Sequence, residues 1–213
     1  MCARRAQHER KTREERKMHT MRATDPIGQQ HGLGRRWLAV LASLLMMVMA
    51  GQAVAAGDID IFDAARDGDN AAIREYVQQG GDLSVTNSRS YTPFILAAYY
   101  GQTDTLALLK SAGADACALD EKGSNAFMGV AFRGFDETAR WLIANTDCDV
   151  NHRNYSGQTA LMMASLFGNE DIIKLLLQAG ADPSIQDARG NTAQSLAAAQ
   201  GLSRIVTLVK FNM

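Results

Sequence analysis

Four carboxylates recur along the chain at nearly equal intervals, and they are the first residues that could do chemistry. Separated by 33, 34 and 33 residues, they are Asp82, Asp115, Asp149 and Asp182. Such a series could form a ladder of metal ligands. An aspartate at a turn, however, more often accepts hydrogen bonds from the backbone amides that follow it. We therefore expect these residues to shape loops, and we expect no metal site.

His152 is the one histidine after residue 56, so any catalytic site that needs an imidazole depends on it. A single histidine cannot form a histidine zinc cluster, and a Ser-His-Asp triad would rest entirely on His152. The phosphate-binding patterns GxxxxGKS/T and GxGxxG are also missing from the sequence. We expect a solvated loop position for His152 and a non-catalytic protein without a cofactor. A hydrolase that uses His152 or the carboxylates is the alternative.

A repeated unit of about 33 residues must position these side chains. Steps of 33, 34 and 33 residues separate Thr92, Asn125, Thr159 and Thr192. A second series keeps the same register and consists of Gly68, Gly101, Gly134, Gly168 and Gly201. Small residues after each threonine favour a first helix, which these glycines should end. Acidic residues should begin a second, apolar helix, which Gly113 and Gly180 should end. One such hairpin cannot bury its apolar stripe alone, so neighbouring units must stack.

The units SYTPFILAAYYG, SNAFMGVAFRG and QTALMMASLFG, with the later Gly-Ala-Asp motifs, strongly resemble ankyrin repeats. The resemblance implies an all-α solenoid of stacked helix-turn-helix units with protruding β-turn loops. It covers residues 57–213, with about five repeats that include degenerate N- and C-terminal caps.

The repeats depart from the ankyrin pattern at informative positions. Apolar packing should replace the pattern's histidine, where this chain has Ile95, Met128, Met162 and Ser195. In the middle unit Asn125 replaces Thr, Asp147 replaces Gly, and one residue is inserted between Leu142 and Asp149. We expect a locally distorted hairpin there. Ser90 stands where the other turns have glycine.

Cys117 and Cys148 remain once the N-terminal segment with Cys2 is set aside. They occupy non-equivalent positions of adjacent repeats, and a disulfide needs Cα atoms within about 7 Å. Two separate, partly buried thiols are the favoured interpretation, and a disulfide is the alternative.

The N-terminal extension, residues 1–56, indicates export. Arg35 and Arg36 precede a predominantly apolar stretch of 14 residues, 37–50, and small residues 53–56 follow. This order of charged, apolar and small residues is typical of a secretory signal peptide. The apolar stretch is short for a membrane span, which needs about 20 apolar residues. We expect cleavage after Ala55 or Ala56, a periplasmic or secreted protein, and no membrane contact afterwards. An uncleaved anchor is the alternative, and translation starts at Met1, Met18 or Met21.

The charge of the remaining chain excludes nucleic acid as a partner. Residues 57–213 carry 12 Lys and Arg against 19 Asp and Glu, a net charge of −7. Nucleic-acid affinity comes largely from basic residues that neutralise phosphates, and this part of the chain lacks such an excess.

The ankyrin resemblance also implies a concave binding groove. By position, its floor carries residue pairs from each first helix: Arg66-Asp67, Tyr99-Tyr100, Phe132-Arg133, Leu166-Phe167 and Ala199-Gln200. Its rim carries loop residues: Arg89, Tyr91, Glu121, Lys122, Ser124, Tyr155, Gln158, Arg189 and Asn191. Aromatic residues and Arg dominate binding hot spots. In the alternative, each Phe packs as core. Met162 and Met163 are interpreted as core filler.

Together these features predict an exported, non-catalytic module that binds a protein partner through this groove. Similar small exported bacterial ankyrin proteins suggest two partner classes, a periplasmic enzyme that the repeat protein supports or a toxin that it neutralises as an immunity protein. A membrane-tethered envelope scaffold is a further alternative, if the N-terminal segment stays attached.

Overall fold

The structure, a computed structural model, describes residues 59–210, all within one compact unit, Asp58–Met213. This part of the chain forms ten helices and no strand: α3 (Ile61–Asp67), α4 (Asn70–Gln78), α5 (Pro93–Tyr99), α6 (Thr103–Ser111), α7 (Ala126–Arg133), α8 (Asp136–Asn145), α9 (Ala160–Phe167), α10 (Glu170–Gln178), α11 (Ala193–Ala199) and α12 (Ser203–Lys210). The predicted all-α class is confirmed. The predicted signal peptide lies outside the described residues.

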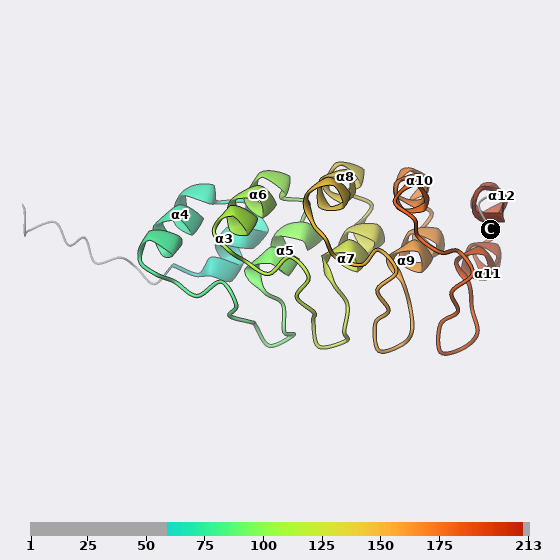
Figure 1. Ribbon diagram of the computed structural model, residues 1–213, viewed down its shortest axis with the longest axis horizontal. Coiled ribbons are helices and arrows are strands. Elements are labelled where there is room, and N and C mark those ends of the chain that lie inside the picture. The colour runs from blue at the N-terminus through green and yellow to red at the C-terminus, as the bar shows by residue number, and fades with distance from the viewer. Residues whose placement is uncertain (1–58, 211–213) are drawn as a thin grey trace, which may run out of the picture. The chain divides into compact units, whose positions relative to one another are not determined.

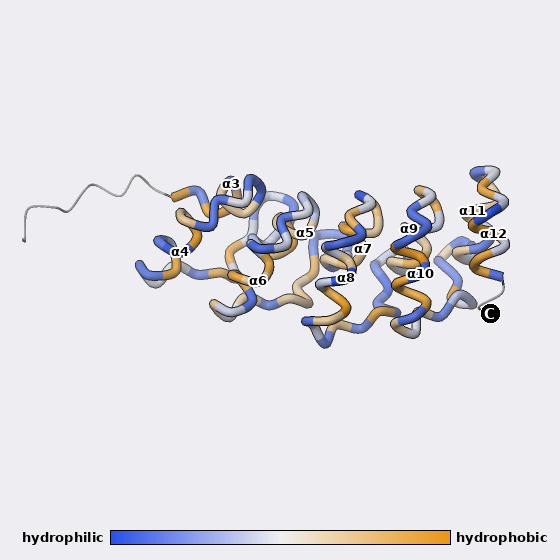
Figure 2. The backbone as a smooth tube through the Cα atoms, turned by 90° about the horizontal axis from the view of Figure 1, so that it is seen from above, coloured by the Kyte–Doolittle hydropathy of each residue, from blue (hydrophilic) through white to orange (hydrophobic). Residues whose placement is uncertain are grey.

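The helices stack in two rows (Figure 1). Each odd-numbered helix from α3 to α11 packs against the next odd-numbered helix, and each pairs with the even-numbered helix that follows it. Long hairpin loops connect successive pairs and protrude beyond the odd-numbered row (Figure 1). The second helices α10 and α12 mix hydrophobic and hydrophilic residues (Figure 2), and their apolar faces bury Ile173, Leu176 and Ile205 against the stack. The predicted solenoid of helix-turn-helix units is confirmed.

The recurring Thr and Asn residues cap the first helix of their units. The side chain of Thr92 accepts a hydrogen bond from the Ile95 amide at 3.2 Å, and Thr159 caps α9 in the same way. Asn125 accepts from the Met128 amide at 3.2 Å, so the replacement of Thr leaves the start of α7 regular. Such an N-cap contributes about 1 kcal/mol to stability.

Apolar side chains fill the space between the stacked units. Phe94, Leu106 and Leu142 are among the largest fully buried residues. At the position of the ankyrin histidine, the structure buries Ile95, Met128 and Met162. Apolar packing thus replaces the polar network there, as predicted.

The expected distortion of the middle unit is confirmed, and it lies at the end of α8. Gly113 and Gly180 follow α6 and α10 with φ of +95° and +91°, the left-handed conformation that commonly follows a helix. After α8, Thr146 is extended instead, with φ −129° and ψ 151°. The side chains of Asn145 and Thr146 donate to the carbonyls of Trp141 and Leu142, at 2.9 and 2.8 Å. Side chains therefore satisfy the last turn in place of a glycine motif.

Cys148 follows this irregular helix end and forms a disulfide with Cys117, with a Cα–Cα distance of 5.4 Å. The favoured interpretation of two separate thiols is therefore wrong. Non-equivalent positions in the repeat suggested that Cys117 and Cys148 lie far apart. The inserted residue and the extended Thr146, however, change the path of the loop after α8. That path places Cys148 beside the loop of the preceding unit.

Ser90 is the one described residue other than glycine with a positive φ, +57°. The equivalent positions in the later hairpins are Gly123, Gly157 and Gly190, with φ between +73° and +80°. An L-residue in this conformation costs about 1–2 kcal/mol. The first hairpin therefore carries local strain that the later hairpins avoid.

Candidate protein-binding groove

The recurring aspartates form turns, as predicted. Asp82, Asp115, Asp149 and Asp182 each accept a hydrogen bond, at 2.8 Å, from the backbone amide two residues later. Additional hydrogen bonds from the Ser84 and Ser184 hydroxyls help to hold the pKa of Asp82 and Asp182 below its usual range. Within residues 59–210, no cluster of three or more His, Cys, Asp or Glu side chains is placed to hold a metal ion.

His152 is not the solvated residue that the sequence suggested. Its imidazole is half-buried, and Nε2 lies 2.7 Å from the carbonyl oxygen of Gly123 in the preceding hairpin. Because a carbonyl oxygen only accepts hydrogen bonds, Nε2 carries the proton. The stacking of the hairpins, which single-unit reasoning ignored, makes His152 a link between two loops.

The odd-numbered helices and the hairpins form one face of the solenoid, and we call this face the groove. A row of aromatic side chains crosses three units on it. The ring centres of Tyr91 and Tyr99 are 6.4 Å apart, those of Tyr99 and Phe132 6.1 Å, and those of Phe132 and Phe167 4.6 Å. The guanidinium of Arg133 lies 5.2 Å from the ring centre of Tyr99, within the range of a cation–π contact. Side chains from three separate units thus form one continuous surface.

The phenylalanines of this row face solvent. Phe132 is 40% exposed and Phe167 is 49% exposed, so the alternative that they pack as core is wrong. Tyr100 is also 40% exposed, and its ring centre lies 5.5 Å from that of Tyr99. Tyr91 and Tyr99 are half-buried, and burial raises the pKa of Tyr91. Large exposed rings that touch one another mark an interaction site more often than single exposed ones do.

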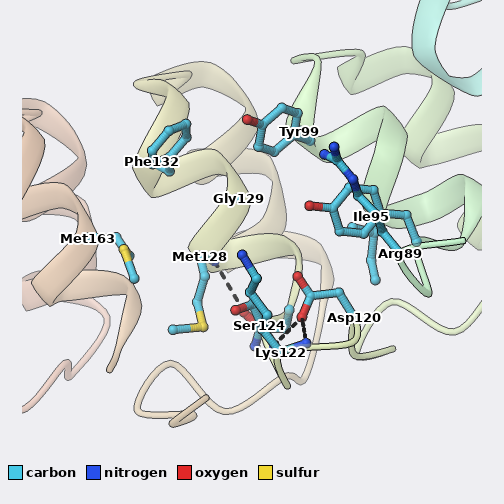
Figure 3. Close-up of a pocket in the computed structure, with 12 residues that line it drawn as sticks. Arg89, Ile95, Tyr99, Asp120, Lys122, Ser124, Met128, Gly129, Phe132 and Met163 are labelled. Atoms are coloured by element: carbon cyan, nitrogen blue, oxygen red, sulfur yellow. Dashed lines mark hydrogen bonds between the residues drawn. The ribbon is translucent and has the colours of Figure 1, made fainter. Parts of the chain in front are cut away.

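Two cavities lie in the groove. The first, of about 280 Å³, has Arg89, Tyr91, Tyr99 and Phe132 among its lining residues (Figure 3). The second, of about 610 Å³, has Phe132, Tyr155, Leu166 and Phe167 among its lining residues. Phe132 and Lys122 line both, so the two cavities are neighbours.

Backbone hydrogen bonds hold the hairpins of the rim together. The amides of Glu121, Tyr155 and Ala188 each donate to a carbonyl of the preceding hairpin, at distances of 3.2, 3.0 and 2.9 Å. Within each hairpin, one side-chain oxygen also accepts hydrogen bonds from two backbone amides. The residues that supply this oxygen are Asn87, Asp120, Asn154 and Asp187. A hydrogen bond from Asn191 holds the pKa of Asp187 below its usual range. Hydrogen bonds thus order the rim both within and between its hairpins.

A family model described as ankyrin repeats in three copies matches residues 61–154, 96–187 and 127–211. The chain belongs to the ankyrin-repeat family. Its ankyrin repeats are a general protein–protein interaction module, and the family is generally non-catalytic.

Relatives of this ankyrin-repeat protein occur in bacteria and in humans. The chain is 24% identical over 144 residues to the ankyrin repeat protein YahD of Escherichia coli, covering 65% of this chain and 72% of that protein. It is 37% identical over 107 residues to an ankyrin repeat-containing protein of Treponema pallidum, covering 49% of this chain and 35% of that protein. It is 30% identical over 164 residues to human B-cell lymphoma 3 protein, covering 74% and 36%. The chain thus spans about a third of the length of the last two relatives.

The ankyrin register places most of the predicted groove residues together, but not all. Tyr100 and Arg133 contact the aromatic row without lining either cavity. Arg189 is exposed on the next hairpin and lines neither cavity. The predicted binding role of these residues stays a prediction.

Sequence reasoning missed part of the floor. Met162 is buried as expected, but Met163, also interpreted as core filler, is half-buried and lines both cavities. Gly129 and Asp120 line the first cavity and were not singled out. A signal existed for both: Gly129 shares the repeat position of Met163, and Asp120 recurs in register with Asn87, Asn154 and Asp187.

Proposed function

We propose that this ankyrin-repeat protein is exported and binds a protein partner there through the groove. The observation that carries the proposal is the aromatic row Tyr91–Tyr99–Phe132–Phe167, which is continuous across three units and partly exposed. Tyr and Arg are among the residue types that are enriched in the hot spots of protein interfaces. The ordered rim supports this role, because a surface ordered in advance loses less conformational entropy on binding.

Truncating two rings of the groove should abolish most of the binding. We expect Tyr100→Ala with Phe132→Ala to weaken the affinity for the partner at least about thirtyfold, since one hot spot accounts for about 2 kcal/mol or more. The measurement is quantitative co-purification of the partner from the exported fraction, followed by titration of the identified partner.

Leu119→Ala is the matched control for this experiment. Leu119 is an apolar residue that is 41% exposed, about as exposed as Tyr100 and Phe132, but it lines neither cavity. Its truncation should leave the affinity unchanged. Equal binding by the double variant and the wild type, with both folded, would refute the groove as the binding site.

Export is the second part of the proposal, supported by the predicted signal peptide and by the Cys117–Cys148 disulfide. Disulfides persist in oxidising compartments and are rare in the reducing cytosol of most organisms. We expect the exported protein to begin at Ala56 or Gly57, which N-terminal sequencing measures. A mature protein that still carries residues 1–56 would contradict the signal-peptide prediction.

A further inference from the structure

Gly129 is an unusual residue for its place in the fold. It lies inside α7 and lines the first cavity. Glycine inside a helix is destabilising relative to alanine. Three of the other four units have a large apolar residue at this position, namely Leu96, Met163 and Leu196, and the first unit has Asp63.

Neither the backbone nor the packing requires a glycine here. Gly129 is not among the glycines with positive φ. A Cβ atom at this position would lie 3.4 Å from Cδ2 of Tyr99, an ordinary van der Waals distance. The missing side chain instead leaves open the first cavity beside Tyr99 and Phe132. Figure 3 shows these two rings on either side of Gly129. We call this cavity the socket.

The socket is large enough for one aromatic side chain. Its volume is about 280 Å³, whereas a protein cavity of about 150 Å³ holds a benzene molecule. Tyr99, Phe132 and Met163 form the apolar part of its lining, and about as much of the lining is polar, from residues that include Arg89, Lys122 and Ser124. The apolar part favours an apolar side chain, because the contact removes both surfaces from water.

Positively charged side chains predominate around the socket. Arg89 and Lys122 line it, and Arg133 lies over the Tyr99 ring, with all three side chains exposed. Among the described residues, none of the three forms a salt bridge, whereas Arg66, Lys174 and Arg204 all do. These unpaired cations occur in a part of the chain that has 12 basic and 19 acidic residues.

Two carboxylates also face this region. Asp120 lines the socket, but it already accepts hydrogen bonds from the amides of Lys122 and Ser124, both at 2.8 Å. Glu121 is exposed on the rim and lines the second cavity. The three cations outnumber these two groups, so the surroundings of the socket favour an acidic partner over a basic one.

We propose that the socket over Gly129 binds one large apolar side chain from an acidic segment of the partner, whose carboxylates face Arg89, Lys122 and Arg133. This inference rests on the proposed function and specifies the chemistry of its partner. The apolar side chain supplies affinity, and the flanking carboxylates supply orientation and a faster association.

The test selects binders from a displayed library of random peptides on the purified wild-type chain. We expect the enriched peptides to place a large apolar residue among Asp and Glu residues. The best peptide should bind at least about tenfold more weakly to Gly129→Leu, because the leucine fills the socket. Arg89→Glu with Lys122→Glu should weaken the same peptide by a similar factor, and more at low salt than at high salt.

Gly129→Ala is the matched control. It adds a single methyl at an ordinary contact distance and improves helix propensity, so it should unfold at a higher temperature than the wild type. It should weaken peptide binding by about threefold, less than Gly129→Leu does, because one methyl group fills only part of the socket. Thermal unfolding checks that Gly129→Leu is folded. We expect it to fold, because leucine or methionine occupies the equivalent position in three other units.

The outcomes separate the two proposals. Enriched peptides that are basic, that lack a large apolar residue, or that bind Gly129→Leu as tightly as wild type would overturn the socket. A selection that enriches no peptide would count against it equally. If Tyr100→Ala with Phe132→Ala still weakens partner binding, the groove remains the binding site and the socket alone is wrong. If that double variant binds normally, the proposed function itself fails.

Discussion

The double variant Cys117→Ser, Cys148→Ser should have a free energy of unfolding about 2–4 kcal/mol lower than the wild type. The disulfide joins residues 31 apart in the sequence. In the chain-entropy description, closing an unfolded loop of this size contributes about 4 kcal/mol to stability. Disulfides usually contribute about 2–4 kcal/mol. Urea unfolding under non-reducing conditions measures the difference.

Wild-type protein in a reducing agent is the natural control for this experiment. Its unfolding midpoint should fall to that of the double variant, and reduction should leave the double variant unchanged. In a solenoid, each unit contacts only its neighbours, so the loss should be local. A larger increase in amide hydrogen exchange over the wild type in α6 and α8 than in α11 would show that the loss of stability is local. Equal midpoints for the oxidised wild type and the double variant would contradict a stabilising disulfide.

The disulfide also compensates for a weak point in the unit that carries the centre of the groove. α8 ends without the glycine motif that follows α6 and α10. Its partner helix α7 carries Gly129, Phe132 and Arg133, which form the socket and the middle of the aromatic row. A covalent link between the loops after α6 and α8 therefore fixes the unit on which the candidate site depends most.

The fold could be predicted from the sequence because its signals are local and repeated. Thr92 caps α5 through its own side chain, and the glycine after each first helix adopts a left-handed conformation that few other residues tolerate. The aromatic row could be predicted from the ankyrin resemblance. That resemblance assigns two adjacent residues of each first helix to the floor of the groove, and Tyr99, Phe132 and Phe167 belong to these pairs.

The features that sequence reasoning missed depend on distances between units. The pairing of Cys117 with Cys148 required the actual path of the loop after α8. The hydrogen bond from His152 to Gly123 required the spacing of two hairpins. Register locates residues within one unit, but it does not give the separation of loops that carry an insertion.

Gly134→Ala should lower the free energy of unfolding by about 2–4 kcal/mol, by two separate effects. Gly134 has φ +82°, where an alanine costs about 1–2 kcal/mol. The new Cβ would also lie 2.8 Å from Oδ1 of Asn169, a distance that forces the amide to move. That amide donates from Nδ2 to the carbonyl of Ala131 at 2.7 Å, across the boundary between two units. Losing a half-buried hydrogen bond of this kind costs about 1–2 kcal/mol more.

Gly168→Ala separates the two effects. Gly168 ends α9 as Gly134 ends α7, with a nearly identical φ of +80°. Its Cβ would lie 3.5 Å from Leu202, an ordinary contact, so Gly168→Ala should show the conformational cost alone. The difference between the two urea unfolding free energies then measures the Asn169–Ala131 contact. Equal losses would show that the Asn169–Ala131 hydrogen bond contributes nothing to the free energy of unfolding.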